Sequence, residues 1–313
     1  MPQGDSTKTP RRGGGLLARL GGLLRRRPGL RLLPLSRLAE GGRVPTESAI
    51  RALAGATPFA GGLLLCRVLG RYKVFVDAAD HTFAPHLVQD GYWEWWTTQF
   101  LARNLRPGER VIDAGAGIGY FTLLAADLVG AAGRVLALEP NAQSAALLRR
   151  NVQLNGLAGR VTVEEAALAG GGGRLVRLVI PPNSPIDAHV LKQDLDPGAG
   201  ARPVDARGTL LVRGRSLDDL VNEAPDLLRL DVGDALEAAW EGMQRLLADR
   251  PDLRLIVTFD AGRCARPEAF LGAVAARFPL RRLHPDARAR ACTAAELLGA
   301  GPVLLYLGRD EPA

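Results

Sequence analysis

Short apolar runs alternate with helical patterns along the middle of the chain. One run at 110–112 ends at Asp113, and a second run at 135–138 ends at Glu139. Between them, residues 120–128 place apolar side chains at the spacing of an amphipathic helix, and glycines follow where that spacing stops. The pattern predicts one β-α-β unit.

The same alternation continues towards the end of the chain and predicts the rest of an α/β sheet. Further strands are expected at 161–163, 227–232, 253–259, 280–283 and 303–307. Helices are expected between them, at 142–154, 235–247 and 268–278. The last two strands should close the sheet as a terminal pair, which gives one core domain over 109–308.

Residues 46–108 form a preface to this core. Strands are predicted at 63–68 and 72–76, and a helix is predicted at 93–101. Residues 90–96 hold three of the four tryptophans. These rings either form the wall of a binding site or, as aromatic groups at helical spacing, pack in the core.

A second segment interrupts the core at about 170–212, where Gly, Pro and Asp are frequent. Its short apolar runs at 175–180 and 209–212 predict a loop insertion with a loose hairpin. Loops above the carboxyl ends of strands commonly bind the substrate. We therefore expect this insertion to contribute to substrate binding.

Residues 1–45 are rich in Gly, Pro and Arg, and we expect a basic, disordered tail. If Leu16–Arg27 were helical, its leucines would share one stripe, as in a basic amphipathic helix that contacts a membrane surface or a partner protein. Gly21 and Gly22 argue against that helix, because each costs roughly 1 kcal/mol relative to Ala.

Composition and charge narrow the class of protein. With 313 residues and 47% apolar side chains, the chain can bury a large core, which excludes disorder throughout. The formal charge is +7, but residues 1–43 carry ten basic and two acidic side chains, which leaves about −1 for the remainder. Because non-specific nucleic-acid affinity needs many phosphates neutralised at once, we expect no nucleic-acid partner for the body.

The cysteines and histidines indicate neither a disulfide framework nor a metal site. Cys66, Cys264 and Cys292 are widely spaced, and the four histidines are scattered. No apolar run approaches the roughly 18 residues of a membrane span, and charges interrupt the tail where a secretory signal needs an uncharged core. We expect a cytoplasmic protein without a metal, or one peripheral to the inner membrane surface if the tail is helical.

Three glycines follow the first core strand at every second position. Gly115, Gly117 and Gly119 would let a ligand lie against the backbone, and Glu139 at the end of the next strand could accept hydrogen bonds from both hydroxyls of a ribose. The nicotinamide fingerprint needs its third glycine one place later, where this chain has Tyr120. A glycine-rich turn in an unrelated doubly wound domain is the simpler alternative.

The order D-x-G-x-G-x-G followed by E-P-N resembles motif I and the acidic loop of class I S-adenosylmethionine-dependent methyltransferases. Together with G-Y-W-E at 91–94, Asn151 with Asn155, S-L-D-D at 216–219 and Asp231, it resembles the FkbM-like family over roughly 63–307. The resemblance implies a Rossmann-like, doubly wound and mostly parallel sheet with an antiparallel terminal strand. It also implies S-adenosyl-L-methionine as cofactor and a hydroxyl of a sugar, glycan, polyketide or related metabolite as acceptor.

The resemblance also implies a set of cofactor-binding positions along the chain. These are Glu94, Asp113, Gly115, Ala116, Gly117, Gly119, Tyr120, Glu139, Pro140, Asn141, Glu165 and Ala166.

The candidate catalytic positions match the family pattern less closely than the cofactor-binding positions do. Asp231 ends the strand expected beside the first one, where it either removes the acceptor proton or caps the following helix. Family members continue as D-V-E-G-A-E, whereas this chain continues as D-V-G-D-A-L, so Asp234 is a shifted candidate for the missing carboxylate. A non-catalytic scaffold that retains the ligand is therefore a competing hypothesis, and a nicotinamide-dependent oxidoreductase is a third.

Overall fold

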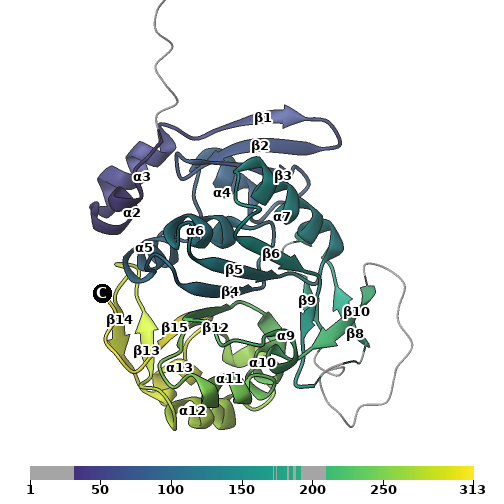
Figure 1. Cartoon of the computed structure of the whole chain (residues 1–313), viewed down its shortest axis with the longest axis vertical. Helices are drawn as coiled ribbons and strands as arrows, with labels where there is room; N and C mark the ends of the chain where they lie inside the picture. The colour runs from purple at the N-terminus through teal and green to yellow at the C-terminus, as the bar shows by residue number, and fades with distance from the viewer. Residues whose placement is uncertain (1–31, 172, 174, 182, 186–187, 192–208) are drawn as a thin grey trace, which may run out of the picture. The chain divides into compact units, whose positions relative to one another are not determined.

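A computed structural model describes residues 32–171, 173, 175–181, 183–185, 188–191 and 209–313 (Figure 1). Leu33–Ala313 form one unit. The amphipathic helix considered at Leu16–Arg27 lies outside the described residues.

The preface consists of helices and a small antiparallel sheet. Its helices are α2 (Leu35–Glu40), α3 (Arg43–Arg51), α4 (Ala84–Gln89) and α5 (Trp95–Asn104). Its strands pair in the order β1 (Gly55–Phe59), β2 (Leu63–Val68) and β3 (Tyr72–Asp77). The sequence did not predict β1, because all of its residues are exposed and Pro58 sits on a sheet edge.

The main sheet has the expected doubly wound topology. Its described strands run in the order β14-β13-β15-β12-β11-β4-β5-β6. Their bounds are β4 (Arg110–Ala114), β5 (Arg134–Leu138), β6 (Val161–Glu164), β11 (Leu227–Leu230), β12 (Arg254–Phe259), β13 (Arg281–Leu283), β14 (Ala289–Ala291) and β15 (Val303–Leu307). The five strands from β12 to β6 are parallel, and β15 is antiparallel to both β12 and β13. The predicted Rossmann-like fold of class I methyltransferases is confirmed.

Helices cover both faces of this sheet (Figure 1). The helices after the preface are α6 (Tyr120–Leu128), α7 (Ala142–Leu154), α9 (Leu217–Leu220), α10 (Leu236–Glu241), α11 (Gln244–Asp249), α12 (Pro267–Ala275) and α13 (Ala294–Leu298). Short 3-10 turns are η2 (Gly233–Ala235) and η3 (Ala261–Arg263). The single helix expected at 235–247 is divided at Gly242, where a Cβ would lie 2.5 Å from the Ala169 carbonyl oxygen.

Alternate residues of the central strands enter two different cores. Val111 and Leu227 pack with α5, α6 and α7, whereas their neighbours Ile112 and Leu228 pack with α10, α11 and α12. Side chains alternate across a strand, so a sheet that is buried on both faces needs continuous apolar runs. This requirement explains the unbroken runs in the sequence.

The insertion forms a second small sheet. Its strands β7 (Ala167–Leu168), β8 (Leu175–Val179), β9 (His189–Val190) and β10 (Thr209–Arg215) pair in the order β7-β10-β8-β9. The antiparallel pair of β8 and β10 corresponds to the predicted hairpin. Figure 1 shows these strands beside the ends of β4, β5 and β6.

Two asparagines of α7 tie the preface to the core. Asn151 Oδ1 accepts the N–H of Phe75 at 2.7 Å, and its Nδ2 donates to the carbonyl oxygens of Phe75 and Ile118. One turn later, Asn155 makes the same pair of bonds with the backbone of Lys73. Because β3 is an edge strand, these side chains satisfy backbone groups that a further strand would otherwise pair.

The start of the ordered body corrects the boundary expected for the tail. Helix α2 and the first residues of α3 lie before residue 46, and both Leu33 and Leu38 are buried. Gln99 and Arg103 on α5 donate side-chain hydrogen bonds to backbone carbonyls at the end of α2. The Gly, Pro and Arg content suggested disorder, but burial of these leucines outweighs local composition.

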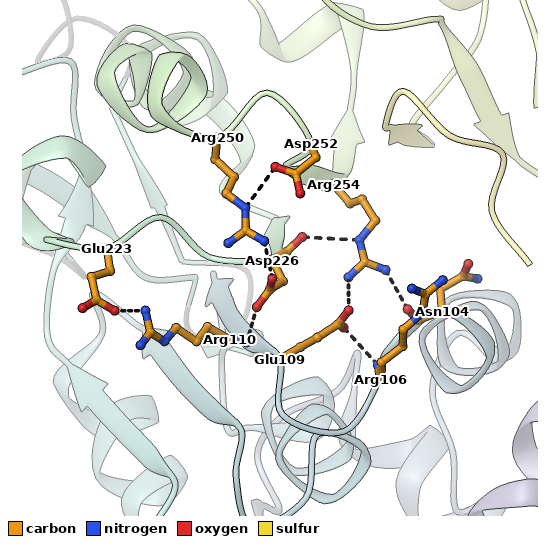
Figure 2. A network of polar contacts seen from close by, with 9 residues as sticks. All are labelled: Asn104, Arg106, Glu109, Arg110, Glu223, Asp226, Arg250, Asp252 and Arg254. Atoms are coloured by element: carbon orange, nitrogen blue, oxygen red, sulfur yellow. Dashed lines mark hydrogen bonds and ion pairs between the residues drawn. The ribbon is translucent and has the colours of Figure 1, made fainter.

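A polar network holds the amino-terminal ends of β4, β11 and β12 together (Figure 2). Arg254 binds Glu109 at 2.7 Å, and Asp226 accepts hydrogen bonds from the backbone N–H of Arg110 and from Arg250. Charge-assisted bonds of this kind are stronger than neutral ones. The network fixes the strand ends that lie away from Asp113 and Glu139.

We expect Leu38→Ala to lower the free energy of unfolding by about 2–5 kcal/mol, because it leaves a cavity where α2 packs on α5. Val44→Ala is the matched control, since Val44 is exposed and its truncation should be nearly neutral. Urea unfolding of the full chain measures both. Equal stability of the two variants would show that α2 does not pack on the body.

Candidate functional site

The main cavity opens at the carboxyl ends of the parallel strands. It has a volume of about 280 Å³ and is lined by residues that follow β4, β5, β11 and β12, together with parts of the preface and the insertion. The chain leaves β4 towards β5 and β6 and then returns to β11 on the other side of β4. Open α/β sheets bind ligands at such a switch point.

Glu139 is buried at the end of β5 and lines the cavity. Its Oε2 accepts the N–H of Gly117 at 2.8 Å, and its Oε1 accepts the N–H of Asn141 at 2.9 Å. Burial raises the pKa of Glu139 to about 7, although these two N–H groups oppose the change. The carboxylate is therefore held rigidly at the cavity wall, with further lone pairs that can accept ligand hydroxyls.

The three glycines of the turn after β4 have different roles. A Cβ on Gly115 would lie 1.9 Å from the carbonyl oxygen of Asp231, so this glycine lets the ends of β4 and β11 approach each other. A Cβ on Gly119 would meet Leu148 of α7 at 2.3 Å. Gly117 has φ +55° and lines the cavity. Gly115 and Gly117 thus combine a backbone conformation that favours glycine with a place in the cavity lining.

Arg229 lies at the centre of the site, although the sequence analysis gave it no role. Its Nη1 donates to Asp113 at 2.9 Å and its Nη2 donates to Asp231 at 2.6 Å, while the guanidinium lies 4.3 Å from the centre of the Phe121 ring. Burial alone lowers the pKa of Arg229, but the surrounding carboxylates of Asp231, Asp113 and Glu94 outweigh it and raise the pKa. The sequence did contain a signal for this role: a charged residue stands inside an apolar strand, and a buried arginine requires partners of opposite charge.

Glu94 brings a third carboxylate to the same cavity. It precedes α5 with a left-handed backbone, φ +37°, which is uncommon for a residue with a side chain. Its Oε2 accepts the Thr97 hydroxyl at 2.8 Å, and burial raises the pKa of Glu94 while Arg229 opposes the change. Backbone strain of this kind is concentrated at functional sites.

The tryptophans divide between the two expected roles. Trp95 is buried in the core, whereas Trp93 lines the cavity. Tyr120 also lines the cavity, and its hydroxyl is hydrogen-bonded to that of Thr98 at 2.9 Å.

The insertion and the preface meet over the cavity. The hydroxyls of Thr82 and Ser184 are 2.7 Å apart, and Asn141 Nδ2 donates to the carbonyl oxygen of Pro185. Thr82 and His189 both line the cavity. Sequence reasoning expected the insertion at the site and named Asn141, but it gave no role to Thr82, Ser184 or His189, because no local pattern brings distant loops together.

Most of the predicted cofactor positions gather at the cavity. Glu94, Gly115, Ala116, Gly117, Tyr120, Glu139, Pro140 and Ala166 line it, and so does Asp231.

The remaining predicted positions lie behind the cavity wall or outside it. Asp113 binds Arg229 and Thr122, Gly119 packs on Leu148, and Asn141 caps α7. Glu165 lies outside the cavity lining, and its half-exposed carboxylate pairs with Arg149. Asp234 likewise does not line the cavity, and it binds Arg263 Nε at 2.8 Å.

The other segments behind the family resemblance are structural. Ser216 caps α9, and the carboxylate of Asp218 accepts the N–H groups of Arg245 and Leu246 at the start of α11. Within the described residues, no group of three or more His, Cys, Asp or Glu side chains could hold a metal ion. No helix in the described part of the chain is long and apolar enough to span a bilayer.

Comparisons with known proteins agree with this geometry. A family model described as the TRM5/TYW2 methyltransferase domain matches residues 71–169. A ribosomal protein L11 methyltransferase of Syntrophomonas wolfei is 44% identical over 66 residues, or 21% of either chain. A protein-L-isoaspartate O-methyltransferase of Aeropyrum pernix is 45% identical over 58 residues, which is 18% of this chain and 22% of that protein.

The likeness to these proteins is local. The chain spans about a fifth of the length of the curated relatives it matches. Among solved structures, the methyltransferase FkbM of Methylobacillus flagellatus KT is 18% identical, with a TM-score of 0.40 over 74% of this chain and 58% of that one. Residues 109–308 have the fold of a class I S-adenosylmethionine-dependent methyltransferase, whereas the FkbM-like family in particular stays a prediction.

Glu139 should make the stability of the ligand-free protein depend on pH. Because its folded-state pKa is raised from 4.5 to about 7, the stability that its proton contributes is complete below pH 4.5 and is lost as the pH rises through about 7. Between about pH 5 and pH 8, the free energy of unfolding should fall by about 2.5 kcal/mol more in the wild type than in Glu139→Gln.

Urea unfolding of both proteins at each pH measures this difference. Glutamine places an NH₂ group against a backbone N–H, so we expect Glu139→Gln to be less stable by an amount that does not depend on pH. Only the change of the free energy of unfolding with pH is therefore informative. Parallel curves would contradict the raised pKa of Glu139.

Proposed function

We propose that the protein is an S-adenosylmethionine-dependent methyltransferase that acts on a hydroxyl group of a sugar, glycan, polyketide or related metabolite. The observation that carries the proposal is the buried Glu139 carboxylate beside the glycine turn. It faces a cavity at the switch point of the sheet and has capacity to accept the two ribose hydroxyls. Gly117 leaves the adjacent backbone open to the ligand.

The residues present fit this cofactor better than a dinucleotide. The N–H of Gly117 is bound to Glu139, so the turn does not offer that donor to a pyrophosphate. The cavity wall that follows β6 is apolar and suits an adenine ring. It is formed by Ala166, Ala167 and Leu168. Both cofactors carry an adenine, so it is the occupied Gly117 N–H that disfavours the nicotinamide-dependent alternative.

When bound, S-adenosylmethionine supplies an electrophilic methyl group on a sulfonium. The protein then has to hold the acceptor oxygen in line with that methyl group, and orientation of this kind contributes much of the rate. Asp231 lies at the cavity wall with one oxygen on Arg229 and its Oδ1 without a hydrogen bond among the described residues. We propose that Asp231 accepts the hydroxyl proton through Oδ1, and that Arg229 holds it in place.

The acceptor class rests on the FkbM-like motifs rather than on the relatives. The matched relatives are named for ribosomal protein L11 and for isoaspartate, and the matched family model for TRM5/TYW2, but the relatives match about a fifth of this chain and the model only residues 71–169. The near-neutral body supports a small-molecule or glycan acceptor over a nucleic acid. A contact of the basic tail with a membrane or a partner protein remains a proposal that rests on composition alone.

We expect Glu139→Ala to weaken S-adenosylhomocysteine binding about tenfold or more, since each hydrogen bond to a charged acceptor contributes roughly 1.5–3 kcal/mol. Gly117→Val should abolish binding, because φ +55° is strained for valine and the residue lines the cavity. Glu165→Ala is the matched control and should bind normally, since its carboxylate faces Arg149.

Calorimetric titration with S-adenosylhomocysteine and, separately, with NAD measures these affinities. Binding of NAD alone would support the oxidoreductase instead. Unchanged S-adenosylhomocysteine affinity in folded Glu139→Ala and Gly117→Val would remove the proposed cofactor site.

Asp231→Asn should lower the methyl-transfer rate by about 10²- to 10⁴-fold with little change in cofactor affinity, which is the usual effect of losing one general base. The rate is measured as transfer of labelled methyl groups to a hydroxyl acceptor found in a screen of sugars, glycans and polyketides. Asp219→Asn is the control, because Asp219 is exposed on α9 away from the cavity.

A full rate in Asp231→Asn would exclude this residue as the base. A drop confined to Asp234→Asn would assign the role to the shifted carboxylate. Cofactor binding without transfer to any screened acceptor would favour the non-catalytic scaffold.

A further inference from the structure

The cavity has a cationic group at the end away from Glu139. Arg263 follows β12 in the turn η3 and lines the cavity, whereas Glu139 ends β5. In the sheet order β12-β11-β4-β5, three strand spacings of about 4.8 Å separate these two strands. The methyl group of the cofactor is bonded to the sulfur next to the ribose carbon, so a ribose held at Glu139 leaves the β12 end for the acceptor.

The guanidinium of Arg263 is bound to Asp234, and further carboxylates hold the backbone of its turn. Asp234 Oδ1 accepts from its Nε at 2.8 Å, and Asp260 caps the turn by accepting the N–H of Gly262 at 2.9 Å. On the other side, the carboxylate of Glu237 accepts the backbone N–H groups of Ala265 and Arg266. Asp234 thus binds the half-exposed side chain itself, whereas Asp260 and Glu237 hold only the backbone around it.

Gly233 makes room for this arginine. A Cβ at Gly233 would lie 3.0 Å from Arg263 Cζ and 3.2 Å from each terminal nitrogen, so the flat face of the guanidinium rests on the glycine. Gly233 also has φ +52°, which disfavours any side chain.

The terminal nitrogens of Arg263 are left for a ligand. Neither has a hydrogen-bond partner among the described residues, and Nε is already used by Asp234. By contrast, both terminal nitrogens of Arg229, the other arginine in the described cavity lining, bind carboxylates. A free pair of parallel N–H groups matches the two oxygens of a carboxylate or phosphate.

We propose that Arg263 forms an acceptor subsite for an acidic group. The methyl acceptor is then a hydroxyl compound with a carboxylate or phosphate near the reacting hydroxyl, such as a sugar acid or a sugar phosphate. The inference rests on the proposed methyltransferase function, because the donor defines which end of the cavity receives the acceptor. Asp231 and Arg263 lie on neighbouring strand ends, so one small molecule can contact both.

The test is calorimetric titration of the protein saturated with S-adenosylhomocysteine. Glucuronate and glucose 6-phosphate are the acidic probes, and glucose is the neutral one. We expect at least one acid to bind about tenfold or more tightly than glucose, and Arg263→Gln to remove that preference. The two acids distinguish a carboxylate site from a phosphate site.

Arg266→Gln is the matched control. Arg266 is exposed, lies three residues away and pairs with Glu241 outside the cavity, so its loss should leave acid binding unchanged. S-Adenosylhomocysteine affinity, measured first in each variant, reports folding and the donor site.

The remaining outcomes contradict the proposal in different ways. If neither acid binds more tightly than glucose, or if Arg263→Gln and Arg266→Gln lower acid binding equally, there is no acidic subsite at Arg263. If folded Arg263→Gln loses S-adenosylhomocysteine affinity, the arginine binds the carboxylate of the cofactor instead. If the wild type does not bind S-adenosylhomocysteine at all, the methyltransferase function itself fails.

Discussion

A buried arginine joins the two strand ends between which the cavity opens. Arg229 binds Asp113 at the end of β4 and Asp231 after β11, and Gly115 lets the two backbones approach within contact distance. An isolated buried charge is very unfavourable, and removal of one partner from such a group typically costs about 3–5 kcal/mol. The position of Asp231, and with it the proposed chemistry, therefore depends on this ion triad.

The rest of the site is assembled around that centre from three parts of the chain. The core supplies Glu139 and the glycine turn, the preface supplies Glu94 and Trp93, and the insertion adds the segment around His189. Hydrogen bonds between side chains and distant backbone groups hold these parts together, as Asn151 does between β3 and the glycine turn. The motifs of the resemblance thus divide into residues that line the cavity and residues that position its walls.

The altered segment after Asp231 has a consistent structural explanation. Gly233 leaves room for the guanidinium of Arg263. Asp234 lies outside the cavity lining and binds that same arginine. Two of the three positions that differ from the FkbM-like pattern are therefore linked through Arg263, and the third, Leu236, is buried in the core. This arrangement places a positive charge at the end of the cavity away from Glu139 and the glycine turn.

The sequence by itself determined the doubly wound sheet, the glycine turn and the acid that follows β5. These features depend on local periodicity and on neighbouring residues, because continuous apolar runs reflect strands that are buried on both faces. Only the tertiary structure decided that α2 belongs to the body, that Glu165 faces Arg149, and that Arg229 and Arg263 carry the charges of the cavity. The reason is physical: burial of leucines and pairing of charges depend on partners that are distant in the chain, and no local pattern contains them.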